Sequence, residues 1–72
     1  MIFIDVDTGF DQRDYLIDEK AKCSDVIKEL MGSEANGYRL WDSSTGTVLR
    51  EDMTLNEQSI TSGCTLRLRR TL

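Results

Sequence analysis

Three aspartates near the amino terminus are the residues whose spacing most resembles a metal-binding loop. Asp5, Asp7 and Asp11 lie in the stretch DVDTGFDQRD and alternate as calcium ligands do in an EF-hand. That pattern also requires a ligand where Gly9 stands and a glutamate where Leu16 stands. Because both positions fail, we interpret the stretch as a solvated acidic hairpin and predict no metal site.

Catalytic chemistry has few candidate residues in this sequence. There is no histidine, so a histidine-based acid–base pair or catalytic triad is excluded. Cys23 and Cys64 are far apart and form no CxxC motif, whereas zinc or redox chemistry needs more closely spaced ligands. We expect both to be small, reduced core residues. We therefore predict a protein that is not an enzyme and holds no cofactor.

The composition fits one small acidic domain. The chain has 72 residues, 39% of them hydrophobic, and no proline, which predicts a single domain over residues 1–72 without a proline-rich linker. The net charge is −4, and an excess of acids argues against nucleic-acid binding, which depends on lysine and arginine. No apolar run is long enough for a membrane span or a signal peptide. We expect a soluble, cytoplasmic protein without direct membrane insertion.

Two periodicities predict the order β-β-α-β-β-short helix-β. Alternating apolar residues predict strands over residues 1–7, 13–18, 38–41 and 47–49 and a last strand in which Leu66 and Leu68 point inward. CSDVIKELMG has helical spacing, with a cap at Ser24 or its neighbour and a stop at Gly32. A helix of about ten residues is too short to stand alone in water, so it must lie on the sheet.

The remaining segments are expected to connect these elements. Residues 32–37 are expected to form a loop. Thr54 and Glu57 have the spacing of a capping box, which predicts a single helical turn. Core positions are expected on the inward side of each element: Ile2, Ile4, Val6, Cys23, Val26, Ile27, Leu30, Met31, Leu40, Leu55, Ile60, Leu66 and Leu68.

The stretch LREDMTLNEQSITSGCTLRL resembles the last third of ubiquitin and aligns with it without gaps. It keeps the leucine before the acidic turn, the Thr-Leu pair, the lone isoleucine and the final Leu-x-Leu. Together with the element order, these features make the chain similar to the ubiquitin-like (β-grasp) superfamily over essentially its whole length. The resemblance implies an α+β fold with a mixed sheet of about five strands and one helix packed across one face.

Within that superfamily, TGTVLREDMTLNEQSITSGCTLRL is most similar to small bacterial YukD-like proteins, which accompany type VII (ESX-like) secretion systems. The shared features are a short glycine-containing hairpin and an I-x-x-G-x-x-L-x-L ending, here Ile60, Gly63, Leu66 and Leu68. Lys22 departs from the family, which tends to have proline there. The resemblance implies a cytoplasmic adaptor or regulator that binds protein partners, among them membrane components of the secretion machine.

The end of the sequence differs from that of ubiquitin. Ubiquitin and the sulfur carriers need a terminal Gly-Gly, because only glycine threads the narrow activating site. Thr71 and Leu72 stand there in this chain, so we expect a protein that does not conjugate. Two alternatives remain open: a ubiquitin-like modifier or sulfur-carrier relative lacking its Gly-Gly tail, and a ubiquitin-like domain excised from a larger protein.

The strand order that the resemblance implies also predicts a binding surface. It places the last strand between the first and the third, so that five side chains lie together on the helix-free face: Phe3, Arg39, Trp41, Arg67 and Arg69. Ubiquitin binds most of its partners through this face, and tryptophan and arginine are enriched at binding hot spots. We predict a protein-interaction face. The alternative is that Trp41 is core and the arginines only pair with Asp5 and Asp7.

Overall fold

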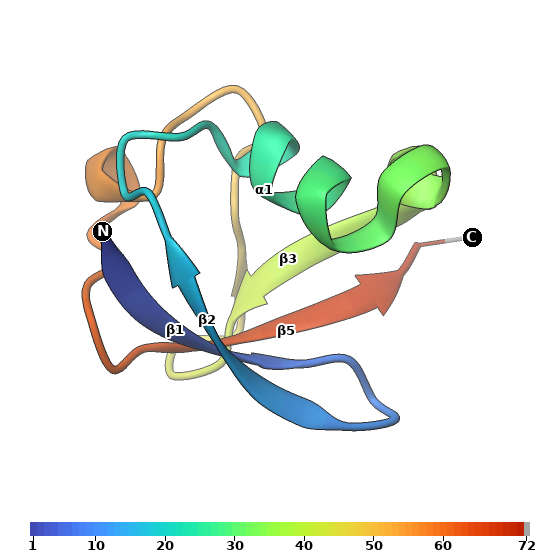
Figure 1. Ribbon diagram of the computed structural model, residues 1–72, viewed down its shortest axis with the longest axis horizontal. Coiled ribbons are helices and arrows are strands. Elements are labelled where there is room, and N and C mark those ends of the chain that lie inside the picture. The colour runs from blue at the N-terminus through green and yellow to red at the C-terminus, as the bar shows by residue number, and fades with distance from the viewer. Residues whose placement is uncertain (72) are drawn as a thin grey trace.

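The computed structural model describes residues 1–71 and has a five-stranded mixed sheet with one α-helix across one face (Figure 1). The strands are β1 (Ile2–Asp7), β2 (Gln12–Ile17), β3 (Tyr38–Asp42), β4 (Thr47–Val48) and β5 (Thr65–Arg70). The helices are α1 (Cys23–Met31) and the 3-10 helices η1 (Gly32–Gly37) and η2 (Asn56–Gln58). This order confirms the predicted α+β arrangement.

The last strand lies in the centre of the sheet. The strand order is β2-β1-β5-β3-β4, with β1 and β5 parallel and the other neighbours antiparallel. The register places Leu66 beside Val6 and Leu68 beside Leu40, so apolar residues of three strands meet on the same face. β5 thus joins the first half of the chain to the second, as the expected strand order requires.

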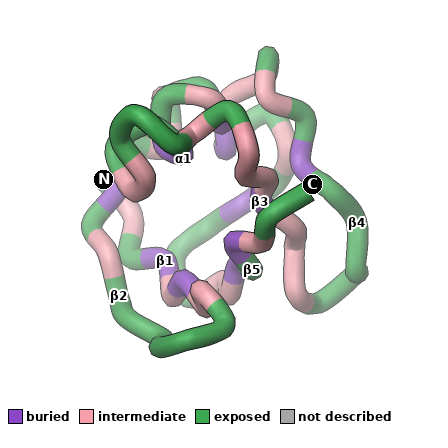
Figure 2. The backbone as a smooth tube through the Cα atoms, turned by 90° about the vertical axis from the view of Figure 1, so that its right-hand side faces the viewer, coloured by how far each residue is buried: buried purple, intermediate pink, exposed green. Residues whose placement is uncertain are grey.

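The core lies between this face of the sheet and α1. Leu66 and Leu68 are buried whereas Arg67 between them is exposed, which is the alternation that a strand covered on one face requires. Buried segments of the central strands and α1 face one another, and most of the exposed backbone lies at the edges (Figure 2). Ile2 is half-buried, less than predicted. The buried apolar residues are Ile4, Val6, Ile17, Cys23, Val26, Ile27, Leu40, Leu49, Leu55, Ile60, Leu66 and Leu68.

The start of α1 is held by backbone groups from a distant segment. Its N-cap residue is Lys22, and no side chain caps it. The amide of Cys23 donates to the Met53 carbonyl at 2.9 Å, and the amide of Ser24 donates to the Glu51 carbonyl at 3.1 Å. The predicted cap at Ser24 is therefore wrong, because a tertiary contact supplies the acceptors that a capping side chain would otherwise supply.

The segment after α1 is helical and not the predicted loop. Gly32 ends α1 as expected, with a φ of 61° that favours glycine. Residues 32–37 then continue as η1, whose tight turns satisfy backbone groups at the helix end. The carbonyl of Gly37 accepts a hydrogen bond from the amide of Thr71 at 2.9 Å, so η1 also holds the chain beyond β5.

No helix within residues 1–71 is both long enough and apolar enough to cross a membrane.

The predicted capping box is confirmed. The amide of Thr54 donates to Oε1 of Glu57 at 3.0 Å, and the amide of Glu57 donates to Oγ1 of Thr54 at 3.1 Å. The hydrogen bond from the Thr54 amide is the main reason that the pKa of Glu57 lies below its ordinary value. The helical turn that follows is η2, and its flanking residues Leu55 and Ile60 are buried as predicted.

Candidate functional site

The face of the sheet opposite α1 carries the residues that alternate with the core, and we call it the open face. Cross-strand pairing places Trp41 beside Arg67, and Arg67 beside Asp7 of β1. All five residues predicted for an interaction face stand at open-face positions of their strands. The open face consists of Gln12, Asp14 and Leu16 of β2, Phe3, Asp5 and Asp7 of β1, Thr65, Arg67 and Arg69 of β5, Arg39 and Trp41 of β3, and Val48 of β4.

Three of the five predicted residues line one hollow of the open face. Trp41, Arg67 and Arg69 border a space of about 340 Å³ together with Asp42 and Gly46. Trp41 is half-buried and Arg67 is exposed. An aromatic ring beside a guanidinium can bind an apolar side chain and a carboxylate at the same time.

Phe3 lies apart from this hollow. It pairs with Leu16 across β1 and β2, and both side chains are more than half exposed, at 62% and 52%. Along β1 it is four residues from Asp7, the neighbour of Arg67, which corresponds to about 13 Å at the rise of a strand. The open face therefore has two apolar patches, one at Phe3 and Leu16 and one at Trp41 and its neighbour Val48.

Two of the predicted arginines are already engaged with carboxylates. Arg39 and Arg69 are direct neighbours on β3 and β5, where like charges repel. Arg39 forms an ion pair with Glu51, and Nη2 of Arg69 lies 3.3 Å from Oδ2 of Asp7. Its alternation with buried Leu68 predicts a largely exposed Arg69, and this prediction is wrong, because the contact with Asp7 leaves the Arg69 side chain half-buried. Within residues 1–71, Arg67 takes part in no ion pair.

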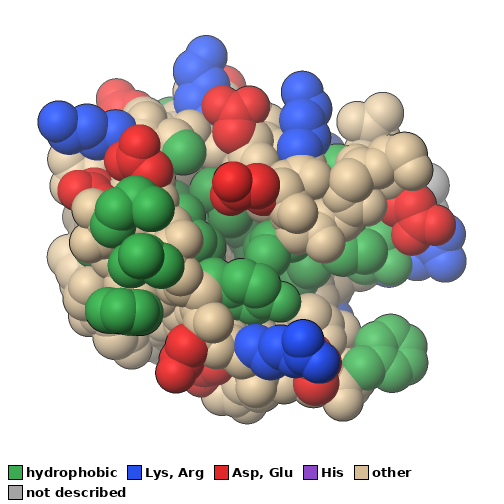
Figure 3. Space-filling model, viewed as in Figure 1, with side chains coloured by type: hydrophobic (Ala, Val, Ile, Leu, Met, Phe, Trp, Pro, Cys, Tyr) green, Lys and Arg blue, Asp and Glu red, His purple; other side chains and the backbone are tan. Residues whose placement is uncertain are grey.

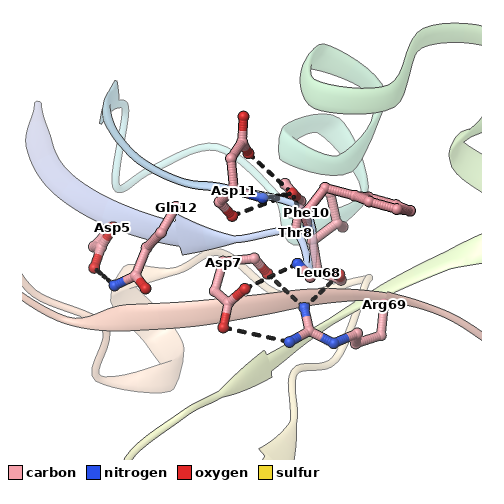
Figure 4. A network of polar contacts seen from close by, with 9 residues as sticks. Asp5, Asp7, Thr8, Phe10, Asp11, Gln12, Leu68 and Arg69 are labelled. Carbon is pink, nitrogen blue, oxygen red and sulfur yellow. Dashed lines mark hydrogen bonds and ion pairs between the residues drawn. The ribbon is translucent and has the colours of Figure 1, made fainter.

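Three aspartates of the β1–β2 hairpin, Asp5, Asp7 and Asp11, accept hydrogen bonds from neighbouring protein groups (Figure 4). Nη1 of Arg69 also donates to the Asp7 carbonyl at 2.7 Å, which fastens the end of β1 to β5. The stretch is thus an ordered polar hairpin. The hydrogen-bond donors are the Gln12 side chain to Asp5, the Gly9 amide to Asp7 at 2.8 Å, and the Thr8 hydroxyl to Asp11 at 3.0 Å.

The pKa of Asp7 lies below its ordinary value, chiefly because the Gly9 amide donates to the carboxylate and secondly because Arg69 lies beside it. The ionised carboxylate therefore stabilises the fold above about pH 4, and this contribution is lost as pH falls through the folded-state pKa. We expect Arg69→Gln to raise the pKa of Asp7 only part of the way to its ordinary value, since the Gly9 hydrogen bond remains. An NMR titration of the Asp7 carboxyl carbon measures both values, and equal values would contradict a role for Arg69.

Known structures identify the architecture. The UBL domain of Plasmodium falciparum Dsk2 superposes with a TM-score of 0.81 and 20% identity, over 97% of each chain. A ubiquitin-like domain of an Arabidopsis thaliana protein superposes with a TM-score of 0.83 and 20% identity, over 99% of this chain and 78% of that one. This chain has the ubiquitin-like fold. No protein-family model and no curated protein sequence matches it.

The ubiquitin-like fold confirms the architecture expected from the resemblance of residues 49–68. At 20% identity the likeness extends to the architecture alone, because one fold can carry many unrelated sites. The binding surface of this ubiquitin-like chain must therefore be argued from its own side chains.

Sequence reasoning missed three exposed apolar residues. Leu16 and Val48 lie on the edge strands of the open face and are 52% and 47% exposed. Each directly precedes a buried residue, Ile17 or Leu49, so strand alternation could have predicted that their side chains point outward. Phe10 stands in the loop between β1 and β2 and is fully exposed. Its only sequence signal is a lone aromatic residue within a polar turn.

Proposed function

We propose that this chain is a non-catalytic, non-conjugating protein-binding module with Trp41 and Arg67 at the centre of its binding face. The observation that carries the proposal is the hollow of about 340 Å³ between these two side chains. An exposed arginine beside a half-buried tryptophan has the composition of an interaction hot spot. Phe3 adds a separate apolar contact, while Arg39 and Arg69 supply positive charge from the border.

A binding role without catalysis is supported by the groups that the chain offers. The sequence contains no histidine, and the carboxylates of Asp5, Asp7 and Asp11 accept hydrogen bonds within the fold. A conjugating relative presents a free glycine tail, whereas Thr71 donates its amide and hydroxyl to the Gly37 carbonyl. Leu72, the other residue on which the non-conjugating prediction rests, lies outside the described residues.

The partner in this proposal is a protein component of a bacterial type VII (ESX-like) secretion apparatus, bound from the cytoplasm. Its support is the sequence likeness at Ile60, Gly63, Leu66 and Leu68. A second candidate is a ubiquitin-like domain that serves a larger protein. This is favoured by the solved structures of the same fold, which are domains of larger proteins.

Two substitutions on the open face test the binding role. Trp41→Ala and Arg67→Glu should each weaken binding of the native partner by about 30-fold or more, the effect of losing a hot-spot side chain. The partner is first identified by affinity capture from the source cells, and its dissociation constant is then measured with purified proteins. Circular dichroism and the melting temperature report whether each variant is folded.

Arg50→Glu is the matched control for Arg67→Glu. Arg50 is exposed like Arg67 but is not part of the open face, and it differs from Arg67 in forming an ion pair, with Asp52. The Arg50→Glu substitution should leave the dissociation constant for the partner unchanged. Undiminished binding by folded Trp41→Ala and Arg67→Glu would contradict the proposed face. Capture of a partner unrelated to secretion would contradict only the type VII assignment.

A further inference from the structure

A second hollow lies at the end of the molecule where the β1–β2 hairpin approaches the end of β5. It has a volume of about 330 Å³, and its principal lining residues are Phe10, Tyr38, Leu68, Arg69 and Arg70, which we call the hairpin groove. In the space-filling view the surface is hollowed at this end, with hydrophobic, basic and acidic side chains around the hollow (Figure 3). Both apolar and cationic groups therefore line the groove.

The hairpin groove is distinct from the open face. Tyr38 pairs with Arg70 across β3 and β5, and both alternate with open-face residues, so they belong to the helix side of the sheet. Arg69 alone lines both hollows. A ligand in the groove would contact Phe10, Tyr38 and Arg70, none of which belongs to the proposed binding face.

Phe10 is the apolar wall of the groove. Its exposure of 101% means that no other described residue covers the ring. A single exposed apolar residue is common and indicates nothing by itself. What distinguishes Phe10 is the ordered backbone that presents it beside an apolar floor and two arginines.

The loop that presents Phe10 is fully hydrogen-bonded. The backbone amides of the four loop residues, Thr8 to Asp11, all donate hydrogen bonds within the loop or to Asp7. The Phe10 ring points away from this polar cluster (Figure 4). The Arg69 guanidinium packs beneath Gly9, whose φ is 90°, and donates to the Asp7 carbonyl. The backbone at Phe10 is thereby held relative to β5, which lowers the entropic cost of ordering the loop when a ligand binds against the ring.

The charges around the groove select an acidic ligand. Two arginines and no carboxylate line it. Arg69 is engaged by Asp7, whereas Arg70 is exposed and forms no ion pair within residues 1–71. A guanidinium on the rim of an apolar groove can bind a carboxylate through two parallel hydrogen bonds.

We propose that the hairpin groove is a second docking site, for a short acidic peptide segment of a partner protein. One large apolar side chain of the peptide packs between Phe10 and Tyr38, and a neighbouring carboxylate pairs with Arg70. The aromatic wall supplies contact area at little entropic cost, and the arginine sets the orientation of the peptide.

Synthetic blocked peptides test this site directly. The probe has the sequence Asp-Asp-Phe-Asp-Asp, and the two control peptides replace its phenylalanine with alanine or its aspartates with lysine. We expect the probe to shift the NMR signals of Phe10, Tyr38 and Arg70, and Phe10→Ala and Arg70→Gln each to weaken binding by about tenfold or more. The control peptides should bind more weakly by a similar factor. Trp41→Ala should bind the probe as the native protein does, which separates this site from the open face.

Three results would overturn the proposal. The first is that the probe shifts only NMR signals of the open face. The others are that folded Phe10→Ala binds the probe as tightly as the native protein does, or that the alanine peptide binds as tightly as the probe. Identical shifts with inorganic phosphate would show an anion site without peptide recognition. A dimer seen by sedimentation that dissociates in Phe10→Ala would show that the groove is occupied by a second copy of the chain.

Discussion

Leu66→Ala should lower the free energy of unfolding by about 2–5 kcal/mol, because it removes burial and leaves a cavity. Leu66 has no exposed surface and lies on the central strand beside Val6. Ile60→Ala, at a position that is 1% exposed, should have an effect of similar size. A domain of this size has a total stability of only about 5 kcal/mol, so either change can unfold it.

Urea denaturation followed by circular dichroism measures both losses. Arg67→Ala is the matched control, since it is the next residue of β5 but points outward, and it should change stability by less than about 0.5 kcal/mol. A Leu66→Ala protein that unfolds at the same urea concentration as the native chain would show that β5 has another register.

In the folded protein Cys64 should react with a thiol reagent about 100-fold or more faster than Cys23, because a fully buried thiol reacts only when the chain opens. Cys23 has no exposed surface, and burial raises the pKa of its thiol to about 11 despite the opposing effect of Arg39. The reactive thiolate of Cys23 is therefore scarce at neutral pH. Cys23 also lies within the apolar core, so a thiol reagent can reach it only when the chain opens.

Single-cysteine variants measure this difference. Cys64→Ser leaves only Cys23, and Cys23→Ala leaves only Cys64, which is partly buried. A coloured thiol reagent should react with Cys64 first in the folded protein and with both at similar rates in denaturant. Equal rates in the folded protein would place Cys23 outside the core.

Local sequence patterns predicted the elements because their causes are local. The alternation around Leu66 and Leu68 and the reciprocal hydrogen bonds of Thr54 and Glu57 involve residues a few positions apart. The groups that cap α1 could not be predicted in this way, since the acceptors for its first amides come from Glu51 and Met53. Only the folded chain brings those carbonyls to the helix.

In the candidate site too, features with local causes could be predicted and features that depend on distant contacts could not. Alternation was enough to place Trp41 and Arg67 on the open face, once the strand order was known from the resemblance. The burial of Arg69 depends on Asp7, at the opposite end of the sequence, and no local pattern contains that contact. The presentation of Phe10 depends on the same pair, because Arg69 fastens the hairpin to β5.

The central position of β5 has a consequence for synthesis on the ribosome. β1 is made first, yet its partner on one side is the last strand to emerge, and β3 waits for the same segment. Until residues 65–70 leave the exit tunnel, the nascent chain can hold only the β1–β2 hairpin, α1 and the β3–β4 hairpin as separate pieces with unpaired edges. Because β5 pairs with both β1 and β3, the complete five-stranded sheet can form only after β5 has been translated, and these distant contacts slow its folding.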